Sequence, residues 1–281
     1  MPTVLRGTCR HADRSLVLND ERSDCPMRIT VITVAYNSAA TIADTLASVA
    51  SQSHPDIEHI VIDGGSRDGT VELVRARGGR VARFVSEPDR GIYDAMNKGL
   101  ALATGELVGF LNSDDVYADP EVLARIAHAM RSPAVDACHG DLVFVDPTRP
   151  DKVVRYWQSR QHERGLCARG WMPAHPTFYA RREAYQRHGD YDLSFRIAAD
   201  FEMCLRLLDV AGLRSAYIPE ILVRMRTGGE STRSLANVLK SNREAARACV
   251  KHGLPGGAGF MLRKVVSKLP QLVRRPLAST P

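Results

Sequence analysis

Several features that define whole classes of protein are missing from this chain of 281 residues. No apolar run approaches the roughly 18 residues that a membrane-spanning helix needs, and the Arg-rich start lacks the apolar stretch of a secretory signal. The six cysteines form no CxxC pair and match no zinc spacing, so free thiols in a reducing cytoplasm are expected. Neither GxGxxG nor GxxxxGKS/T occurs, which argues against a dinucleotide-dependent dehydrogenase and a P-loop kinase.

Aromatic residues are also scarce, at 6%, and the basic residues are dispersed, so nucleic-acid binding has little support. The net charge of +6 still suits an anionic partner. With 44% hydrophobic and 25% charged residues, the chain fits a globular protein of one large domain or two small ones. We expect a mobile extension over residues 1–26, a main domain over 27–230 and a basic helical region over 231–281.

What the chain does contain is a regular alternation of strand and helix patterns. Apolar, often β-branched runs predict strands at residues 29–35, 57–62, 81–85 and 107–111, with helical spacing between them. This alternation predicts an α/β fold with a mostly parallel sheet flanked by helices. Residues 119–230 are less regular and predict a smaller antiparallel part, so we divide the main domain into a regular half, 27–118, and a less regular half, 119–230.

Polar residues follow each predicted strand of the first half. They are Tyr36-Asn37, Asp63, Glu87 to Arg90, and Asn112 to Asp115. In sheets of this kind, ligands bind outside the carboxyl ends of the strands. The polar residues therefore predict one binding site along one edge of the sheet.

The run ELVGFLNSDD, residues 106–115, is the most informative of these strand ends. Its two adjacent carboxylates, Asp114 and Asp115, repel each other unless a cation or fixed waters neutralise them. A hard cation that keeps several waters and takes one or two carboxylates describes Mg2+ or Mn2+ holding a diphosphate. Asn-Ser-Asp-Asp is also ordinary turn composition, so a plain loop is the alternative.

Five segments together resemble the family 2 glycosyltransferases. They are ITVITVAYN, VIDGGSRDGT, EPDRGIYDAMNKGL, the strand ending in NSDD, and AADFEMCLRL, which occur in the family's order over roughly residues 27–230. The resemblance is closest to the branch that builds bacterial exopolysaccharides, O-antigens and envelope glycolipids. It implies a GT-A fold, a nucleotide-sugar donor, a divalent metal, and inversion at the anomeric carbon. It also implies that residues 27–118 form the nucleotide-binding half and residues 119–230 the acceptor half.

For the donor, the resemblance implies residues at the strand ends and in the helix after the third strand. Tyr36 and Asp63 would line the nucleobase pocket, and Asp114 would hold the metal. The other donor-side residues that it implies are Asn37, Asp89, Arg90, Asp94, Asn97, Lys98, Asn112 and Ser113. The family often has acids where this chain has Gly64 and Asn112, which leaves the nucleobase and metal ligation by residue 112 open.

For the acceptor, the same resemblance implies Asp200 as the catalytic base, which would take a proton from a hydroxyl group. The Glu that often precedes this base in the family is Ala199 here, and Glu202 could substitute as a supporting acid on the acceptor side. His175 and Asp141 are the other acceptor-side residues implied. A purely structural loop histidine is an equal alternative for His175.

Basic residues late in the chain carry two further expectations. Arg224 and Arg226 resemble a segment of the family that closes over the donor diphosphate, which suits guanidinium groups. The stretch FMLRKVVSKLPQLVRR, residues 260–275, is typical of a helix lying on an anionic membrane, with a solvated charged tail as the alternative. Membrane contact would suit a lipid-linked acceptor and a cytoplasmic enzyme on the inner face of the cell membrane.

The expected function is metal-dependent, inverting transfer of a sugar from a nucleotide-sugar donor to a saccharide or lipid-linked acceptor in bacterial cell-surface synthesis. Two alternatives are left open. A sugar nucleotidyltransferase has a similar fold and metal, but a Gly-rich loop usually follows its first strand, where this chain has AYNS. A binding protein with a decayed site is motivated by Asn112 and Ala199.

Overall fold

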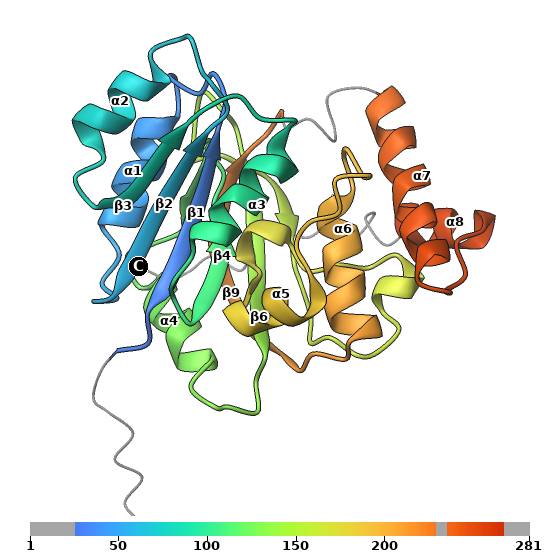
Figure 1. Cartoon of the computed structure of the whole chain (residues 1–281). Coiled ribbons are helices and arrows are strands. Elements are labelled where there is room, and N and C mark those ends of the chain that lie inside the picture. The colour runs from blue at the N-terminus through green and yellow to red at the C-terminus, as the bar shows by residue number, and fades with distance from the viewer. Residues whose placement is uncertain (1–25, 229–234, 267–281) are drawn as a thin grey trace, which may run out of the picture.

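The computed structural model describes residues 26–228 and 235–266 (Figure 1). Within these ranges the chain forms one nine-stranded sheet. Its strands are β1 (Ile29–Ala35), β2 (Ile57–Asp63), β3 (Val81–Ser86), β4 (Leu107–Phe110), β5 (Asp115–Tyr117), β6 (Ala137–Val145), β7 (Val153–Trp157), β8 (Tyr179–Arg181) and β9 (Ser215–Arg226). The α-helices are α1 (Ile42–Ala50), α2 (Thr70–Arg77), α3 (Ile92–Leu102), α4 (Val122–Ala129), α5 (Arg182–His188), α6 (Ala199–Cys204), α7 (Leu235–Lys251) and α8 (Ala258–Val266).

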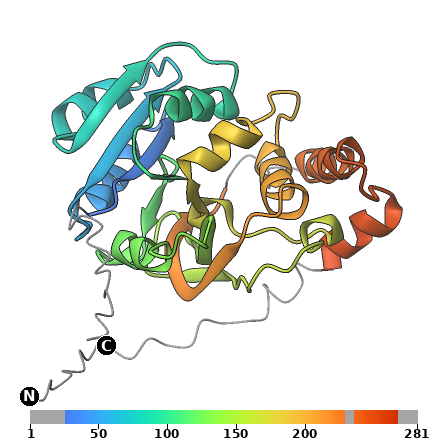
Figure 2. The ribbon, with the colours of Figure 1, turned by 60° about the horizontal axis from the view of Figure 1, so that its bottom comes forward.

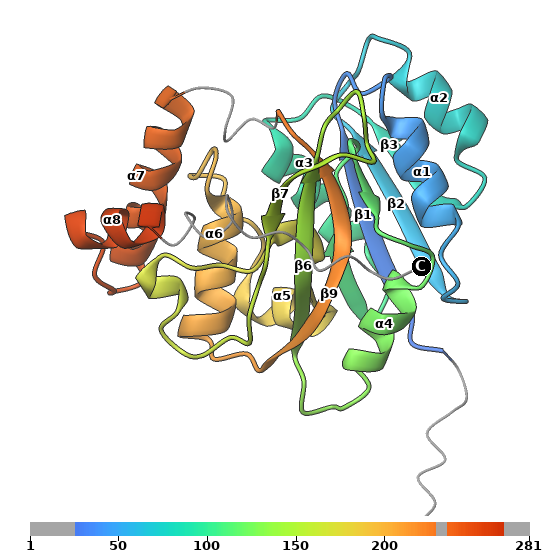
Figure 3. The ribbon, with the colours of Figure 1, turned by 180° about the vertical axis from the view of Figure 1, so that it is seen from behind.

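The sheet joins a parallel half to a mixed half. Its strand order is β3-β2-β1-β4-β8-β6-β9-β5, with β7 paired to β6. The strands from β3 to β4 are parallel, and β8 joins them antiparallel to both β4 and β6. Helices α3 and α5 cover one face, and α1 and α4 lie on the other (Figures 1 and 3). The α/β fold with a smaller antiparallel part is therefore confirmed.

Two features of the mixed half differ from the sequence prediction. The sequence pattern predicts a short strand at residues 213–218, whereas β9 runs from Ser215 to Arg226. Its far end pairs with β5, a short strand that begins at Asp115 and that the sequence did not predict. Arg224 and Arg226 consequently lie in a strand that borders the NSDD turn.

The C-terminal helices pack into the same core as the sheet. Ala245, Ala248 and Cys249 of α7 and Phe260 of α8 belong to one buried cluster with residues of β1, β4 and α6. Figures 2 and 3 show α7 and α8 beside α6, on the side of the sheet away from α1 and α2. The cluster shows that these helices complete the hydrophobic core on this side of the sheet.

The inner side of α8 is used for packing, which limits the membrane expectation. The Phe260 ring contacts the Phe201 ring with centroids 5.8 Å apart, and Lys264 is only 4% exposed, with its ammonium 4.7 Å from the Phe201 ring centre. The rest of the expected amphipathic segment, and the extension over residues 1–25, lie outside the described residues. Within the described part of the chain, no helix has the length and apolar character needed to cross a membrane.

One glycine is fixed by close packing under the NSDD turn. A Cβ atom on Gly109 of β4 would lie 2.2 Å from a ring carbon of Tyr179, closer than any real contact. The Tyr179 hydroxyl in turn hydrogen-bonds the Tyr117 hydroxyl of β5. Gly109 thus lets β4, β8 and β5 approach one another directly beneath the residues expected to hold the metal.

Candidate active site

The turn after β1 is tied to the loop after β2 at the carboxyl edge of the sheet. Asn37 has φ of +48°, the one non-glycine residue with positive φ among the described residues, a conformation that Asn tolerates better than most. Its backbone N–H donates to Ser66 Oγ at 2.8 Å, and its side-chain oxygen accepts the Arg67 N–H at 3.0 Å. Asn37 therefore holds the two loops together and leaves the neighbouring Tyr36 ring in solvent.

Asp63 is fully buried, and the protein itself supplies hydrogen bonds to its carboxylate. The backbone N–H groups of Gly65 and Ser66 donate at 3.1 and 3.0 Å, the Ser86 hydroxyl donates at 2.7 Å, and the Ser66 hydroxyl donates as well. A buried carboxylate requires such donors. Asp63 fixes the loop beside the expected nucleobase pocket, and direct contact between Asp63 and a base stays a prediction.

Gly64 lies closely packed between Tyr36 and Asp89. A Cβ atom on Gly64 would lie 2.4 Å from a carboxylate oxygen of Asp89 and 3.3 Å from the Tyr36 ring. Tyr36 is 66% exposed, so one face is available for stacking on a planar base. The close approach explains why this chain has glycine, and no second acid, after Asp63.

The donor-side residues around α3 divide into two groups. Arg90 pairs with Asp94 at 2.8 Å, and Lys98 pairs with Glu87 at 2.8 Å. Hydrogen bonds from Arg90 hold the pKa of Asp94 below its usual value. Asn97 lies apart from this group. Its amide donates to the Tyr191 carbonyl at 2.9 Å and accepts the Tyr191 N–H at 2.8 Å, so it braces α3 against the loop that precedes α6.

The NSDD turn gathers oxygen atoms that no other described residue satisfies. Asn112 donates its amide to Asp115 at 3.2 Å, while the Asn112 side-chain oxygen and the other Asp115 oxygen are buried without a hydrogen-bond partner in the described chain. Burial raises the pKa of Asp114, and burial together with the Asp114 charge raises the pKa of Asp115 well above its usual value. Uncompensated hard oxygen donors of this kind fit a divalent cation.

The flanks of this turn are held by other parts of the chain. The Ser113 hydroxyl hydrogen-bonds the Ser38 hydroxyl at 2.7 Å, which joins the turn to the loop after β1. Arg226 donates to the Asp114 carbonyl at 3.0 Å and to the Asp44 carboxylate at 2.6 Å. One of the two late arginines therefore lies at the expected metal site, whereas Arg224 donates to the Pro150 carbonyl.

Asp200 stands in the first turn of α6 and lines a cavity of about 790 Å³. Its carboxylate lies 3.4 Å from the Tyr93 hydroxyl. Asn112 and His175 line the same cavity, so it joins the NSDD turn to the expected base. His175 is buried, hydrogen-bonds the Tyr191 hydroxyl at 2.5 Å, and has a pKa lowered by burial against an opposing effect of the Asp200 charge.

The remaining cavity walls are aromatic and basic. Trp157 and Trp171 line the cavity, and α7 and α8 contribute to its boundary. Among the described residues, Asp200 is the single acid that lines the cavity, against five basic side chains, which are Arg155, Arg160, Arg169, Arg226 and Lys264. A positive cavity with tryptophan walls favours a ligand that combines sugar faces with negative charge. The two tryptophans were missed from the sequence because neither lies in a recognisable motif.

The other two residues expected on the acceptor side are turned away from the cavity. Asp141 is buried and accepts hydrogen bonds from Tyr156, Ser159 and Tyr217, and burial raises its pKa. Glu202 is fully buried beneath α7, where Arg206, Lys251 and His252 donate to it. Neither lines the cavity, so both have structural surroundings in this fold.

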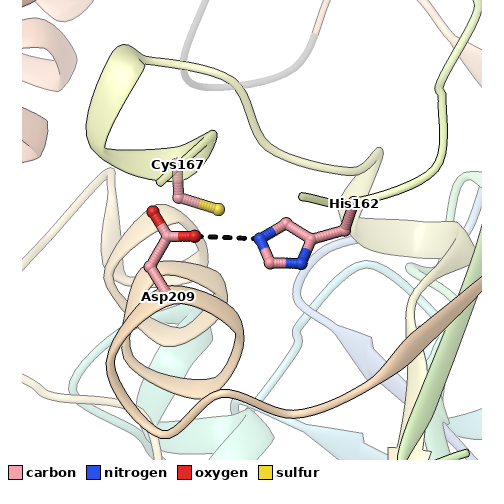
Figure 4. A group of neighbouring side chains, drawn as sticks. All are labelled: His162, Cys167 and Asp209. Carbon is pink, nitrogen blue, oxygen red and sulfur yellow. Dashed lines mark hydrogen bonds and ion pairs between the residues drawn. The ribbon is translucent and has the colours of Figure 1, made fainter. Parts of the chain in front are cut away.

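The side chains of His162, Cys167 and Asp209 lie together outside the proposed site (Figure 4). His162 hydrogen-bonds Asp209 at 2.9 Å, and Cys167 approaches both. Asp209 also accepts the N–H groups of Gly165 and Ala168, so its oxygens are satisfied without a cation. Burial raises the pKa of the Cys167 thiol well above its usual value, which disfavours the thiolate that binds metals. The group braces the loop that carries Trp171, on whose ring His162 stacks.

Fold and site together define a glycosyltransferase of the GT-A class. The chain belongs to glycosyl transferase family 2, whose family model matches residues 30–197. An uncharacterized glycosyltransferase of Mycobacterium tuberculosis is 35% identical over 187 residues, which are 63% of this chain and 68% of the relative. A PGL/p-HBAD biosynthesis glycosyltransferase of Mycobacterium bovis is 29% identical over 191 residues, which are 67% of this chain and 72% of the relative.

Solved structures support the same fold. S. aureus TarS 1–349 in complex with UDP matches with a TM-score of 0.62 at 18% identity, over 87% of this chain and 72% of that chain. The mannosyltransferase PcManGT from Pyrobaculum calidifontis, in complex with GDP-Man and Mn2+, matches with a TM-score of 0.62 at 22% identity, over 88% and 72%. The family match favours a transferase over the nucleotidyltransferase and the decayed binding protein.

Proposed function

We propose that this enzyme is a metal-dependent, inverting glycosyltransferase that moves a sugar from a nucleotide-sugar donor to a saccharide or lipid-linked acceptor in cell-surface glycan synthesis. The observation that carries the proposal is the shared cavity. Asn112, from the oxygen-rich turn, and Asp200 both line it, so a sugar between them has a leaving group on one side and a base on the other.

In the mechanism, Asp200 accepts the proton of an acceptor hydroxyl as that oxygen attacks the anomeric carbon in line. The bond to the diphosphate breaks in the same displacement, which inverts the configuration. Mn2+ or Mg2+ held by Asp114, with Asn112 and Asp115 beside it, would supply Lewis-acid stabilisation of the leaving diphosphate. Arg226 is the nearest described cation to that turn and suits the same negative charge.

The donor assignment rests on the edge formed by Tyr36, Gly64 and Asp89. An exposed tyrosine ring beside bare backbone suits a nucleobase, and Arg90 before α3 and Lys98 within it suit the phosphates or the sugar. Relatives of the same fold were solved with UDP and with GDP-Man, which supports a nucleotide sugar and leaves the base to experiment.

The acceptor assignment rests on the cavity walls. Tryptophan faces suit sugar rings, and the excess of basic side chains suits the phosphate of a lipid-linked acceptor. The resemblance to a PGL/p-HBAD biosynthesis glycosyltransferase supports an acceptor of the cell envelope.

Replacement of Asp200 by asparagine tests the proposal. We expect turnover, measured as nucleoside diphosphate release from UDP-, GDP- and dTDP-sugars with Mn2+, to fall by about 100-fold or more. The stabilisation of the fold by a bound donor, measured as a thermal shift, should stay unchanged because Asp200 lies on the acceptor side. The control is Asp190→Asn, an acid on the same loop that does not line the cavity. Near-normal turnover of Asp200→Asn would refute the assignment.

A further inference from the structure

A carboxylate from α7 holds the turn that leads into Asp200. Glu244 is buried, and one of its oxygens accepts three consecutive backbone N–H groups, those of Arg196, Ile197 and Ala198, at 3.1, 2.9 and 3.0 Å. Asp200 follows two residues later, in the first turn of α6. Figures 1 and 2 show α7 beside α6, and the three hydrogen bonds of Glu244 join α7 to the turn before α6.

Three N–H groups that converge on one atom need an anion at that point. Backbone N–H groups ahead of a helix have no partner in the helix itself, and their dipoles together favour a negative charge. A hydrogen bond to a charged acceptor is also about twice as strong as a neutral one. The three bonds fix the orientation of three peptide planes, which decides the direction in which α6 begins.

The opposite side of the same turn is fixed by α3. The Tyr93 hydroxyl donates to the Ile197 carbonyl at 2.8 Å and lies 3.4 Å from the Asp200 carboxylate. Ile197 is therefore held through its N–H by Glu244 and through its carbonyl by Tyr93. Among the described residues, the Asp200 carboxylate has two hydrogen-bond partners, the Tyr93 hydroxyl and the Phe201 N–H. Because these contacts are few, the position of Asp200 depends on the bracing of the turn before it.

Further contacts from α7 act on earlier residues of the loop. Arg247 donates to the Ser194 carbonyl at 2.6 Å and lies over the Phe195 ring at 4.1 Å, and Lys251 pairs with Asp192 at 2.8 Å. These contacts hold the loop against α7. Glu244 differs from them because its bonds reach the three residues immediately before Ala199 and Asp200.

We propose that Glu244 is a positioning residue for the catalytic base: it fixes the turn at residues 196–198 and thereby aims the Asp200 carboxylate into the acceptor cavity. This inference rests on the proposed function, since it assumes that Asp200 takes the proton. Glu244 does not line the cavity, so it acts through Asp200 and touches neither donor nor acceptor.

The test compares Glu244→Ala with a matched control. Glu58 is also a buried glutamate that braces a loop, accepting the Thr104 N–H at 2.7 Å, but it lies near the amino end of β2, remote from Asp200. We expect Glu244→Ala to lower kcat by about 10- to 100-fold with the donor KM within about twofold, since small displacements of a reacting group are costly. Glu58→Ala should lower the melting temperature and leave kcat within about twofold.

A conservative variant and a double variant separate positioning from general damage. Glu244→Gln keeps an acceptor oxygen without the charge, so kcat should fall by only about three- to tenfold. Because Glu244 acts through Asp200, the double variant Asp200→Asn/Glu244→Ala should be no slower than Asp200→Asn alone. A structural defect would slow the double variant further.

Each outcome decides the inference. It is overturned if Glu244→Ala, or a folded Glu244→Gln where the alanine variant does not fold, keeps the wild-type kcat. It is also overturned if the kcat of the double variant is lower than that of Asp200→Asn by the same factor by which Glu244→Ala lowers the wild-type kcat. The same holds if Glu58→Ala lowers kcat as much as Glu244→Ala does. Failure of the proposed function is distinguishable, because it requires that Asp200→Asn itself remain active.

Discussion

Replacing Asn112 with aspartate would place a third carboxylate beside Asp114 and Asp115. In the wild type the Asn112 amide donates to Asp115 at 3.2 Å, and the two remaining side-chain oxygens of this pair have no partner among the described residues. The substitution exchanges an attractive contact for a repulsive one where burial already raises the pKa of both aspartates. The substitution should therefore lower the unfolding free energy of the metal-free protein and increase its affinity for a divalent cation.

The magnitude follows from the contact distance. Two unit charges separated by the 3.2 Å of the present contact repel by about 5 kcal/mol at an effective dielectric constant of about 20. The cost cannot exceed that of protonating one of the carboxylates at pH 7, because protonation removes the repulsion. Raising a carboxyl pKa from about 4 to 7 costs about 4 kcal/mol. We expect the free energy of unfolding to fall by about 3 to 4 kcal/mol without metal.

Urea denaturation in EDTA and in millimolar Mn2+ measures both effects. The gain in unfolding free energy on adding Mn2+ should be larger for Asn112→Asp than for the wild type, by about 1.4 kcal/mol for each tenfold gain in affinity. Gln186→Glu, which adds the same charge on the exposed side of α5, is the control and should behave like the wild type. Equal gains from Mn2+ in the wild type and Asn112→Asp would refute the view that residue 112 faces the cation.

Two further predictions concern the sheet beneath the site. Burial lowers the pKa of His59 and of His139 to about 4, so the unfolded chain takes up protons at a higher pH than the folded chain does. The stability present above pH 6.5 is therefore lost as the pH falls towards 4. Between pH 7 and pH 4, the wild type should lose about 3 kcal/mol more unfolding free energy, measured by urea denaturation, than His59→Gln. An unchanged pH profile in His59→Gln would contradict this prediction. Gly109→Ala, whose Cβ meets the Tyr179 ring, should destabilise the fold by about 1 to 3 kcal/mol in urea, and a variant as stable as the wild type would contradict the packing described.

The parallel half could be predicted because its signals are local. The strand at Ile29–Ala35 is a continuous apolar or β-branched run, and the strand at Ile57–Asp63 contains the apolar run Ile60–Ile62. Parallel strands buried on both faces are expected to look like this. The polar residues after them then meet at one edge by geometry alone. Two of the unpredicted partners of Asp63 are also local, since Gly65 and Ser66 form the turn after it.

The acceptor half could not be predicted in the same way because its contacts join distant segments. Glu202 was expected to support Asp200, but two residues along a helix turn the side chain by about 200°, which places it beneath α7. The acid that does reach the turn before Asp200 is Glu244, in a helix whose sequence pattern gives no hint of that contact. β5 was missed for a similar reason, because it exists only through pairing with the end of β9.

The cavity draws its walls from the mixed half of the sheet and from the helices that follow the family match, which ends at residue 197. In the proposed assignment, most donor-side residues precede residue 115 and most of the cavity wall follows it, with Arg226 as the late residue at the donor diphosphate. Relatives that exchange residues 198–266 as a block would exchange the proposed base, its bracing helix and part of the cavity wall together. A cut at the end of the family match would keep most of the proposed donor edge and remove the proposed base.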